Sequence, residues 1–495
     1  MQYLIEYPMG KQRIENHLKQ MVLNAKYQYE GGRMSALELV HTVIQKLPIP
    51  LLEEYTQVFF LPLVLQLVND ESKLCRETVS NCIIALLTRL SNQVLLSLLE
   101  YAERWSSTKG DDGHQLRRTS IQLFGIFLDA RIDFMKRADR IKMVLTYIQE
   151  CLENEFGSSD YTDVLHGKKW EMTYFCLQTM EKLCKNSTLL VRKDVSVWEN
   201  IIKCLVHPHP WVKLISSRII HSQFSGESSD NFSSVDKKNA SSIILRIPGS
   251  LFDIVRNLCF QLNSEEDQTT EEIATMAIKN LTWAINIMNA HPSLCYKGGG
   301  IQELADDDIE EYVEQDEMRS ENKIQNPVTW LITRLSNIAK RNDSFRRESI
   351  FKCFAAFASV CDVKMTSSYL ELMVEPLNRV ISEVEHKEAN SVRRGRPSSG
   401  STSGADLPKE VMQLLENVCG TDRFLEALAS IKSKAREKRE ARKQMLAAEA
   451  VHDPEAAAKR KIRRHEKEKD RKKRRIQERK ANRGVFRKKP RHIVS

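Results

Sequence analysis

Apolar residues recur along most of the chain with the spacing of amphipathic α-helices. Four segments repeat them most regularly at intervals of three and four residues, namely 79–90, 141–152, 251–262 and 274–288. Such a stripe indicates that each helix buries one face against its neighbours. No alternating apolar and polar pattern of comparable length occurs, so we predict an all-α body.

The predicted helices follow one another in a repeated order. One helix ends in a polar or proline-containing turn, and a basic or aromatic residue lies early in the next helix. In the clearest example Pro62 lies inside the first helix, Asp70 in the turn and Arg76 early in the second helix. The basic residues that we assign to the same position in further pairs are Arg117, Lys213 and Arg346.

These four basic residues are separated by 41, 96 and 133 residues. The first spacing is one period of a HEAT-type repeat, which is about 40–47 residues, and we interpret each of the others as two or three periods lengthened by insertions. The sequence therefore predicts a HEAT-type α-solenoid of about six or seven helix pairs. An irregular helical bundle is the alternative.

Polar segments divide this predicted body. We expect a Ser-rich insertion at 222–242 and an acidic strip at 303–321, which is either a solvated insertion or a docking strip for a basic partner. The domains that we expect are a solenoid at 1–385, a flexible linker at 386–408, terminal helices at 409–431 and a basic helical tail at 432–495.

Charge is distributed unevenly along the chain. The formal net charge is +9, but residues 432–495 hold 26 Lys and Arg against 9 Asp and Glu, and the other residues hold 49 against 57. A mildly acidic body with a strongly basic tail implies a polyanionic partner for the tail. Nucleic acid is the first candidate, and acidic protein surfaces or nuclear import receptors are the second.

The tail has the composition of an exposed helix. Asp453, Pro454 and Glu455 form a good helix start, and we expect the helix to run from 453 to 481 and to stop at 482–484. Between 459 and 480 it has 14 basic and 4 acidic residues and almost no apolar face to bury. It can therefore contact phosphates on all sides, although a merely solvated charged helix is the alternative.

We expect the tail residues to serve RNA binding and nuclear import together, and Phe486 could in addition stack on a base. The candidate residues are Lys459, Arg460, Lys461, Arg463, Arg464, Arg471, Lys472, Lys473, Arg474, Arg475, Arg479, Lys480, Arg483, Phe486, Arg487, Lys488, Lys489 and Arg491.

Motifs of catalysis and of metal or cofactor binding are missing from the sequence. It has no GxxxxGK[ST], GxGxxG, HExxH, GxSxG or Cys-x-x-Cys, and the histidines at 207 and 209 alternate with prolines as in a turn. Its longest apolar stretch has 11 residues, whereas a membrane span needs about 20. The 11 cysteines are scattered, as in a reducing compartment. We expect an intracellular protein without catalytic residues, cofactor, metal, membrane or small-molecule substrate.

Three segments resemble a known family, the giant HEAT-repeat component of the small-subunit processome known as "down-regulated in metastasis". The resemblance is strongest in residues 3–130 and 425–492. It lies in YPMGKQRIENHLKQMVLNAKYQYEGGRMSALELVHTVIQKLP, in FFLPLVLQLVNDESKLCRETVSNCIIALL and in the basic KRKIRRHEKEKDRKKRRIQERKANRGVFRKKPRH.

This resemblance implies a nucleolar scaffold of early ribosome biogenesis that binds pre-ribosomal RNA and processome proteins. It also implies that the chain is the C-terminal portion of a longer protein. A HEAT-repeat adaptor or transport factor that binds only proteins, and whose tail is just a nuclear localisation signal, is the alternative function.

Overall fold

A computed structural model describes nine stretches of the 495-residue chain. They are residues 10–110, 113–157, 170–186, 195–225, 247–263, 270–296, 326–340, 344–392 and 403–485. Within these stretches the regular structure is helical and no strand is present. The chain forms two compact units, which meet in the sequence between Val418 and Cys419.

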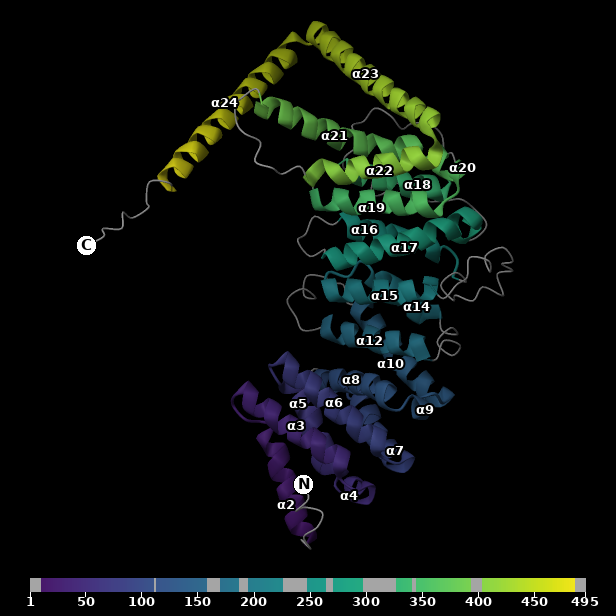
Figure 1. Ribbon diagram of the computed structural model, residues 1–495, viewed down its shortest axis with the longest axis vertical. Helices are drawn as coiled ribbons and strands as arrows, with labels where there is room; N and C mark the ends of the chain where they lie inside the picture. Colours follow the sequence, from purple (N-terminus) through teal and green to yellow (C-terminus); the bar gives the residue numbers. More distant parts are fainter. Residues whose placement is uncertain are drawn as a thin grey trace, which may run out of the picture. The chain divides into compact units, whose positions relative to one another are not determined.

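The first unit consists of antiparallel helix pairs (Figure 1). The first helices of the pairs are α2 (Lys11–Asn24), α5 (Thr56–Asn69), α7 (Asn92–Ser106), α10 (Ala138–Gly157), α14 (Val195–Cys204), α16 (Ser250–Asn263) and α18 (Pro327–Ala339). Their partners are α3 (Glu30–Lys46), α6 (Lys73–Arg89), α8 (His114–Ala130), α12 (Trp170–Asn186), α15 (Pro210–Ser225), α17 (Glu271–Ala290) and α19 (Ser344–Val360).

Short helices connect some of the pairs, and two longer helices follow the last pair. The short helices are α4 (Ile49–Glu54), α9 (Ile132–Met135), the 3-10 helix η3 (Pro292–Cys295) and α20 (Val363–Ser368). The two longer helices are α21 (Leu370–Val392), which packs against α18, and α22 (Ser403–Cys419).

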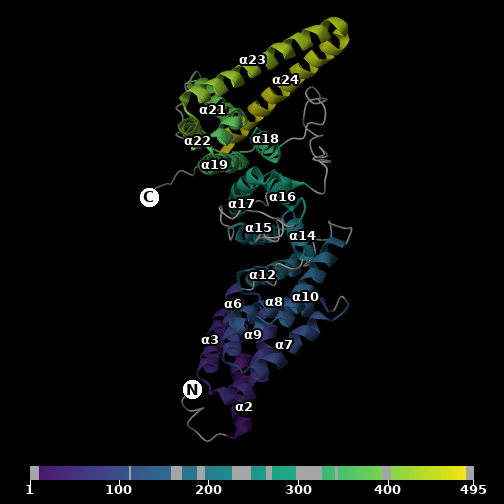
Figure 2. The same cartoon turned by 90° about the vertical axis from the view of Figure 1, so that its right-hand side faces the viewer.

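The pairs stack so that their helices form two layers. We call α3, α6, α8, α12, α15, α17 and α19 the B layer, because each of them contacts the next one in this order. Figure 2 shows α3, α6, α15, α17 and α19 along one side of the unit and α7, α10, α14 and α16 along the other. This arrangement confirms the predicted all-α, HEAT-type solenoid, with seven helix pairs in the described residues.

The two longer spacings each correspond to two helix pairs in the described residues, which agrees with the predicted two or three periods. Arg117 lies in α8, Lys213 in α15 and residue 346 in α19. Between Lys213 and residue 346, the segments 226–246, 264–269, 297–325 and 341–343 lie outside the described part. The acidic strip at 303–321 falls there entirely, as does the Ser-rich insertion beyond Ser225.

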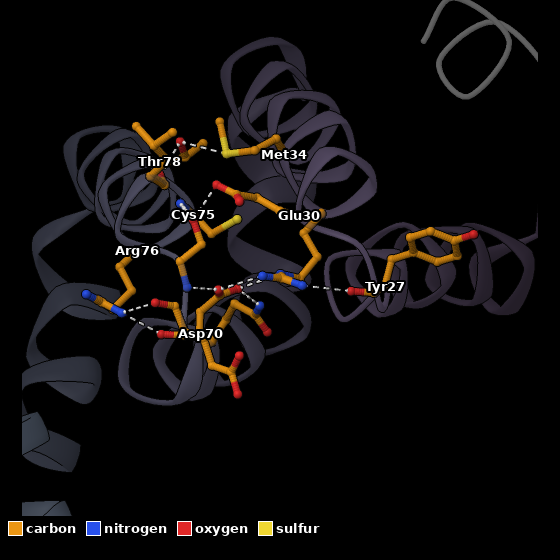
Figure 3. A network of polar contacts seen from close by, with 12 residues as sticks. Tyr27, Glu30, Met34, Asp70, Cys75, Arg76 and Thr78 are labelled. Carbon is orange, nitrogen blue, oxygen red and sulfur yellow. Dashed lines mark hydrogen bonds and ion pairs between the residues drawn. The ribbon is translucent and has the colours of Figure 1, made fainter. Parts of the chain in front are cut away.

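Arginine side chains hold the helix turns together, as Figure 3 shows for the first two pairs. Arg33 donates to both carboxylate oxygens of Asp70, at 3.0 and 3.1 Å, and thereby joins α3 to the α5–α6 turn. The Asp70 side chain also accepts the Ser72 backbone N–H at 2.9 Å, and it is almost fully buried. Because a buried carboxylate needs several donors, this set of bonds fixes the turn between the two helices.

The core lies between the two layers. Its largest fully buried side chains include Phe59, Phe124, Phe127, Trp198 and Phe354. All of them lie on the apolar stripes of helices in the pairs, so burial of these stripes is the main force that stacks one pair on the next.

The second unit is built from two long helices. These are α23 (Thr421–His452) and α24 (Pro454–Val485), and they contact each other on either side of their junction. Residue 431, where we expect the terminal helices to give way to the tail, lies inside the continuous helix α23. Phe424, Ala427 and Ile431 are the buried apolar residues of α23.

Candidate nucleic-acid interface

The basic tail forms a helix almost where the sequence predicts one. Helix α24 begins at Pro454, directly after Asp453, which supports the expected start. The expected stop at 482–484 is wrong, because the helix includes Gly484 and ends at Val485. A glycine inside a helix costs only about 1 kcal/mol relative to alanine, so a single one does not have to end a helix with many good helix formers.

In the second unit the side chains change from partly buried to exposed after Ile431. From Lys432 to Gln477, every side chain that the structure describes is exposed. The large apolar side chains on this surface are exposed as well, from 44% at Leu446 to 81% at Val451. Among the described side chains of this segment none is buried, which leaves the charged groups available to a partner.

The predicted site residues fall into three groups. Those whose side chains are described lie exposed on α24, and they are Lys459, Arg460, Lys461, Arg463, Arg464, Arg471, Lys472, Lys473 and Arg474. A second group lies on the α24 backbone with side chains outside the described set, and it consists of Arg475, Arg479, Lys480 and Arg483. The third group lies outside the described residues and consists of Phe486, Arg487, Lys488, Lys489 and Arg491.

Positive charge dominates the surface of α24. The helix contains 15 Lys and Arg against 5 Asp and Glu. Lys459 and Glu455 form an ion pair of 2.7 Å one turn apart, and both side chains are largely exposed. Exposed pairs of this kind are worth at most about 1 kcal/mol, so they do little to offset the repulsion between the remaining cations. A polyanion that follows the helix would neutralise these charges.

The body of the chain carries a second surface, which the sequence analysis did not identify. Trp170 and Tyr174 of α12 lie beside His209 of the α14–α15 turn and Trp211 at the start of α15, and we call these four side chains the aromatic cluster. The rings come from adjacent helix pairs, about 40 positions apart in the sequence, and no short motif contains them all. The closely spaced Trp and His residues of the turn are the one signal that could have indicated them.

The two histidines at 207 and 209 organise the α14–α15 turn, as their alternation with proline predicted. The His209 backbone N–H donates to Nδ1 of His207 at 3.0 Å, and the Trp211 N–H donates to Nδ1 of His209 at 3.3 Å. In the part of the chain that the structure describes, no three His, Cys, Asp or Glu side chains are placed to hold a metal ion.

The buried thiols of the solenoid are poor nucleophiles. Burial raises the pKa of Cys82, Cys259 and Cys295 to about 12, so these groups stay protonated at neutral pH. These cysteines act as small apolar residues of the core.

None of the helices in the described stretches is long and apolar enough to cross a membrane.

Comparison with known proteins identifies relatives over nearly the whole chain. The U3 small nucleolar RNA-associated protein 20 of Saccharomyces cerevisiae is 24% identical over 482 residues, which is 95% of this chain and 17% of the relative. The protein of the same name from Schizosaccharomyces pombe is 24% identical over 468 residues, or 92% of this chain and 16% of the relative. The chain thus spans about a sixth of the length of these curated relatives.

Solved helical-repeat structures are more distant. Kap121p matches with a TM-score of 0.41 and 14% identity, covering 92% of this chain and 42% of its own. A designed armadillo repeat protein matches with a TM-score of 0.29 and 12% identity, covering 54% of this chain and 99% of its own. These scores are too low to add to what the helix pairs themselves show.

The family comparison is the more decisive one. Residues 116–478 match the family described as small subunit processome component 20 homolog, C-terminal. The matched region is more than half of the chain and extends from the third helix pair of the solenoid into the basic helix α24. The chain therefore belongs to the family of the C-terminal region of small subunit processome component 20 homologs.

Proposed function

We propose that the chain is a non-catalytic scaffold of the small-subunit processome in the nucleolus, where it binds pre-ribosomal RNA and assembly factors during maturation of the small-subunit rRNA. The relatives are associated by name with the U3 small nucleolar RNA, and the matched family is named after the processome. In this proposal the solenoid contacts proteins and α24 contacts RNA. The observation that carries the RNA contact is the exposure of every described basic side chain of α24, from Lys459 to Arg474.

The physical basis of the RNA contact is electrostatic. Guanidinium and ammonium groups that bind phosphates release counterions from the RNA, so the affinity falls steeply with salt. A single helix with cations on all sides can also follow a curved or folded RNA without a matching protein surface. Nothing in this mode of binding requires a catalytic group, and a solenoid offers long surfaces for protein partners.

The proposal can be tested with two full-length variants that remove equal charge. One variant replaces six exposed basic residues of α24 by glutamine, namely Arg463, Arg464, Arg471, Lys472, Lys473 and Arg474. The matched control replaces six exposed basic residues of α23 by glutamine, namely Lys432, Lys434, Lys438, Arg439, Arg442 and Lys443. Both variants carry an added import signal, so that nuclear entry does not depend on the tail.

We expect crosslinks between the chain and precursor rRNA in cells to fall strongly in the α24 variant and much less in the α23 variant. In vitro, the dependence of log affinity for single-stranded RNA on log salt concentration should become shallower by about 4 if all six residues contact phosphates. Crosslinking that persists in the α24 variant would place the RNA contact elsewhere. If neither the wild type nor the variants crosslink to RNA, the protein-only adaptor with a localisation signal is the better function.

A further inference from the structure

The aromatic cluster exposes a large aromatic ring beside a stack of others. The rings of Trp170 and His209 are nearly parallel, with centroids 3.6 Å apart and planes 6° apart. The Trp211 ring is 5.5 Å from Trp170 and 5.6 Å from His209, at 78° and 81° to them. Because these two distances are nearly equal, Trp211 lies beside the stacked pair rather than above one end of it, and 56% of Trp211 remains exposed.

Ring contacts and hydrogen bonds hold the aromatic cluster in place. Tyr174 lies 6.4 Å from Trp170 and 5.9 Å from Trp211, and its hydroxyl accepts a hydrogen bond of 2.8 Å from Gln178. Nδ1 of His209 accepts the Trp211 backbone N–H, which orients the imidazole in its stack. Burial, assisted by the neighbouring His207, lowers the pKa of His209, so the ring stacks in its neutral form at neutral pH. Trp211 is thus presented on a fixed support.

The excess of positive charge in the solenoid lies in the B layer, which contains α12 and α15. The seven helices of the B layer contain 15 Lys and Arg against 9 Asp and Glu. Their seven partner helices contain 9 of each kind. Helix α15, which begins next to the cluster, has Lys213 and Arg218 and no acidic residue. The body as a whole is mildly acidic, but the helices of its B layer carry a net positive charge.

A partly exposed cation follows the exposed ring on the same helix. Arg218 is on α15 two turns after Trp211, and 45% of its side chain is exposed. One of its nitrogens contacts Glu181 at 2.7 Å, but a guanidinium has five N–H donors and can hold a phosphate with the others. Glu171 in the first turn of α12 is already paired with Arg118 from the preceding helix of the B layer. The surroundings of the cluster are therefore compatible with an anionic ligand.

We propose that Trp211, supported by the aromatic cluster, stacks on an unpaired base of single-stranded RNA while Arg218 contacts the adjoining phosphate. An exposed aromatic face and an excess of cations match the two parts of a nucleotide, its planar base and its anionic backbone. A proline-rich peptide would also suit the rings, but it carries no anionic group to use the positive charge of the layer. This contact goes beyond the proposed function, because it assigns a second RNA site to the solenoid.

The test uses the full-length chain in which the six basic residues of α24 have been replaced by glutamine, so that RNA binding by the tail does not mask the cluster. In this background Trp211→Ala is compared with Trp211→Phe, which keeps an aromatic face, and with Trp105→Ala. Trp105 is a suitable control because it is a partly exposed tryptophan that packs on Tyr101 in α7, remote from the cluster in sequence and outside the B layer. The probe is a short single-stranded RNA with one 2-aminopurine, whose fluorescence is quenched by stacking.

We expect Trp211→Ala to weaken binding of the single-stranded RNA by roughly 5- to 150-fold and to abolish the quenching, since stacking of one base is worth that much. Trp211→Phe should retain most of both signals, and Trp105→Ala should bind like the parent. A duplex of the same sequence has no unpaired base to stack, so its affinity should not change between the variants.

Two results would overturn the inference. One is unchanged single-stranded RNA binding in Trp211→Ala, in which case the rings are more suited to a protein partner. The other is an equal loss of single-stranded and duplex binding, which would indicate a purely electrostatic contact. In the unmodified chain, sequencing of the RNA-crosslinked peptides separates this site from the proposed function, because peptides from α12 and α15 report on the cluster and peptides from α24 report on the tail.

Discussion

The guanidinium of Arg76 donates to the backbone carbonyls of Asp70 and Glu71, at 2.7 and 3.0 Å, and so binds the carbonyls that follow the end of α5. Other helix pairs repeat this relationship. Arg117 of α8 reaches the carbonyls of Thr108 and Gly110 after α7. Arg347 of α19 reaches the last residue of α18. Carbonyls at the end of a helix lack partners within the helix, so an arginine early in the second helix ties the two helices of a pair together.

Removing this contact should destabilise one repeat. We expect Arg76→Met to lower the free energy of local unfolding of α5 and α6 by about 2 kcal/mol, which is the usual worth of hydrogen bonds from a charged group. Native-state hydrogen exchange of the amides in these helices measures it directly. The matched control is Lys73→Met, because Lys73 lies in the first turn of α6 with a largely exposed side chain. Equal protection in the two variants would show that the bonds of Arg76 contribute nothing.

The same contact explains how far the sequence could predict the fold. The apolar stripes were sufficient for the helix pairs together with Pro62 in the first helix, Asp70 in the turn and Arg76 in the second helix, because both patterns are local. At α19 a bond to the last carbonyl of the preceding helix is made by Arg347, one position after the residue that we assigned, whose side chain lies outside the described set. Neighbouring arginines cannot be told apart by composition, since the choice depends on which side of the helix faces the turn. Arg33, which makes the same kind of bond to the turn carbonyls of Tyr27 and Gln28, was missed for a similar reason.

The two candidate sites also differ in how far the sequence could predict them. The basic helix α24 could be predicted from composition, because it depends only on residues that are consecutive in the sequence. The aromatic cluster could not be predicted, because Trp170 and Trp211 meet only when α12 and α15 are stacked. The spacing of 133 residues left open whether two or three pairs lie between Lys213 and residue 346, because composition does not give the length of an insertion, and the described residues there hold two.

Burial at the core of the third pair should account for much of its stability. Phe127 is fully buried, and its ring lies 6.5 Å from that of Phe134 at 27°. We expect Phe127→Ala to reduce the free energy of unfolding of this region by about 3–5 kcal/mol, through lost burial and a residual cavity. Leu116→Ala on the same helix, at a residue that is 39% exposed, is the control and should cost less than about 1 kcal/mol. Urea unfolding followed by hydrogen exchange distinguishes the two, and similar losses would contradict this account of the core.

The aromatic cluster should respond to acid. Burial is the largest cause that lowers the pKa of His209, His207 adds to it, and Glu171 opposes it. An unfolded chain therefore binds a proton at His209 more readily than the folded chain. Stability is fully present above the ordinary pKa of histidine, about 6.5, and is lost as the pH falls through that value toward the lower pKa of the folded state.

This dependence can be isolated with one variant. We expect the thermal midpoint of the wild type to decrease more between pH 7 and pH 5 than that of His209→Phe, which keeps a stacking ring and cannot be protonated. Tryptophan fluorescence during heating gives the midpoint, and two of the six tryptophans of the chain belong to the cluster. All other histidines are common to both proteins, so the difference between them belongs to His209. Identical slopes would mean that protonation of His209 costs the folded chain nothing.

Repulsion between like charges should control the helicity of α24. Cations outnumber anions threefold along this helix, and neighbours one turn apart are about 5–6 Å from each other. Added salt shortens the screening length from about 10 Å at 0.1 M to about 3 Å at 1 M. We therefore expect a peptide of residues 453–485 to gain helical circular dichroism with salt, and to gain more with single-stranded RNA, whose phosphates neutralise the cations at much lower ionic strength.

A peptide of residues 432–452 from α23 is the matched control. It carries 7 Lys and Arg against 3 acidic residues, and its pairs, such as Arg436 with Glu440 at 3.0 Å, stabilise the helix by attraction. Screening weakens these attractions as well as the repulsions, so its helicity should change much less with salt. A loss of α24 helicity on adding salt would show that pairs such as Lys459 with Glu455 outweigh the repulsion. The helix would then need no polyanion to keep its form, and its charge alone would no longer argue for an RNA partner.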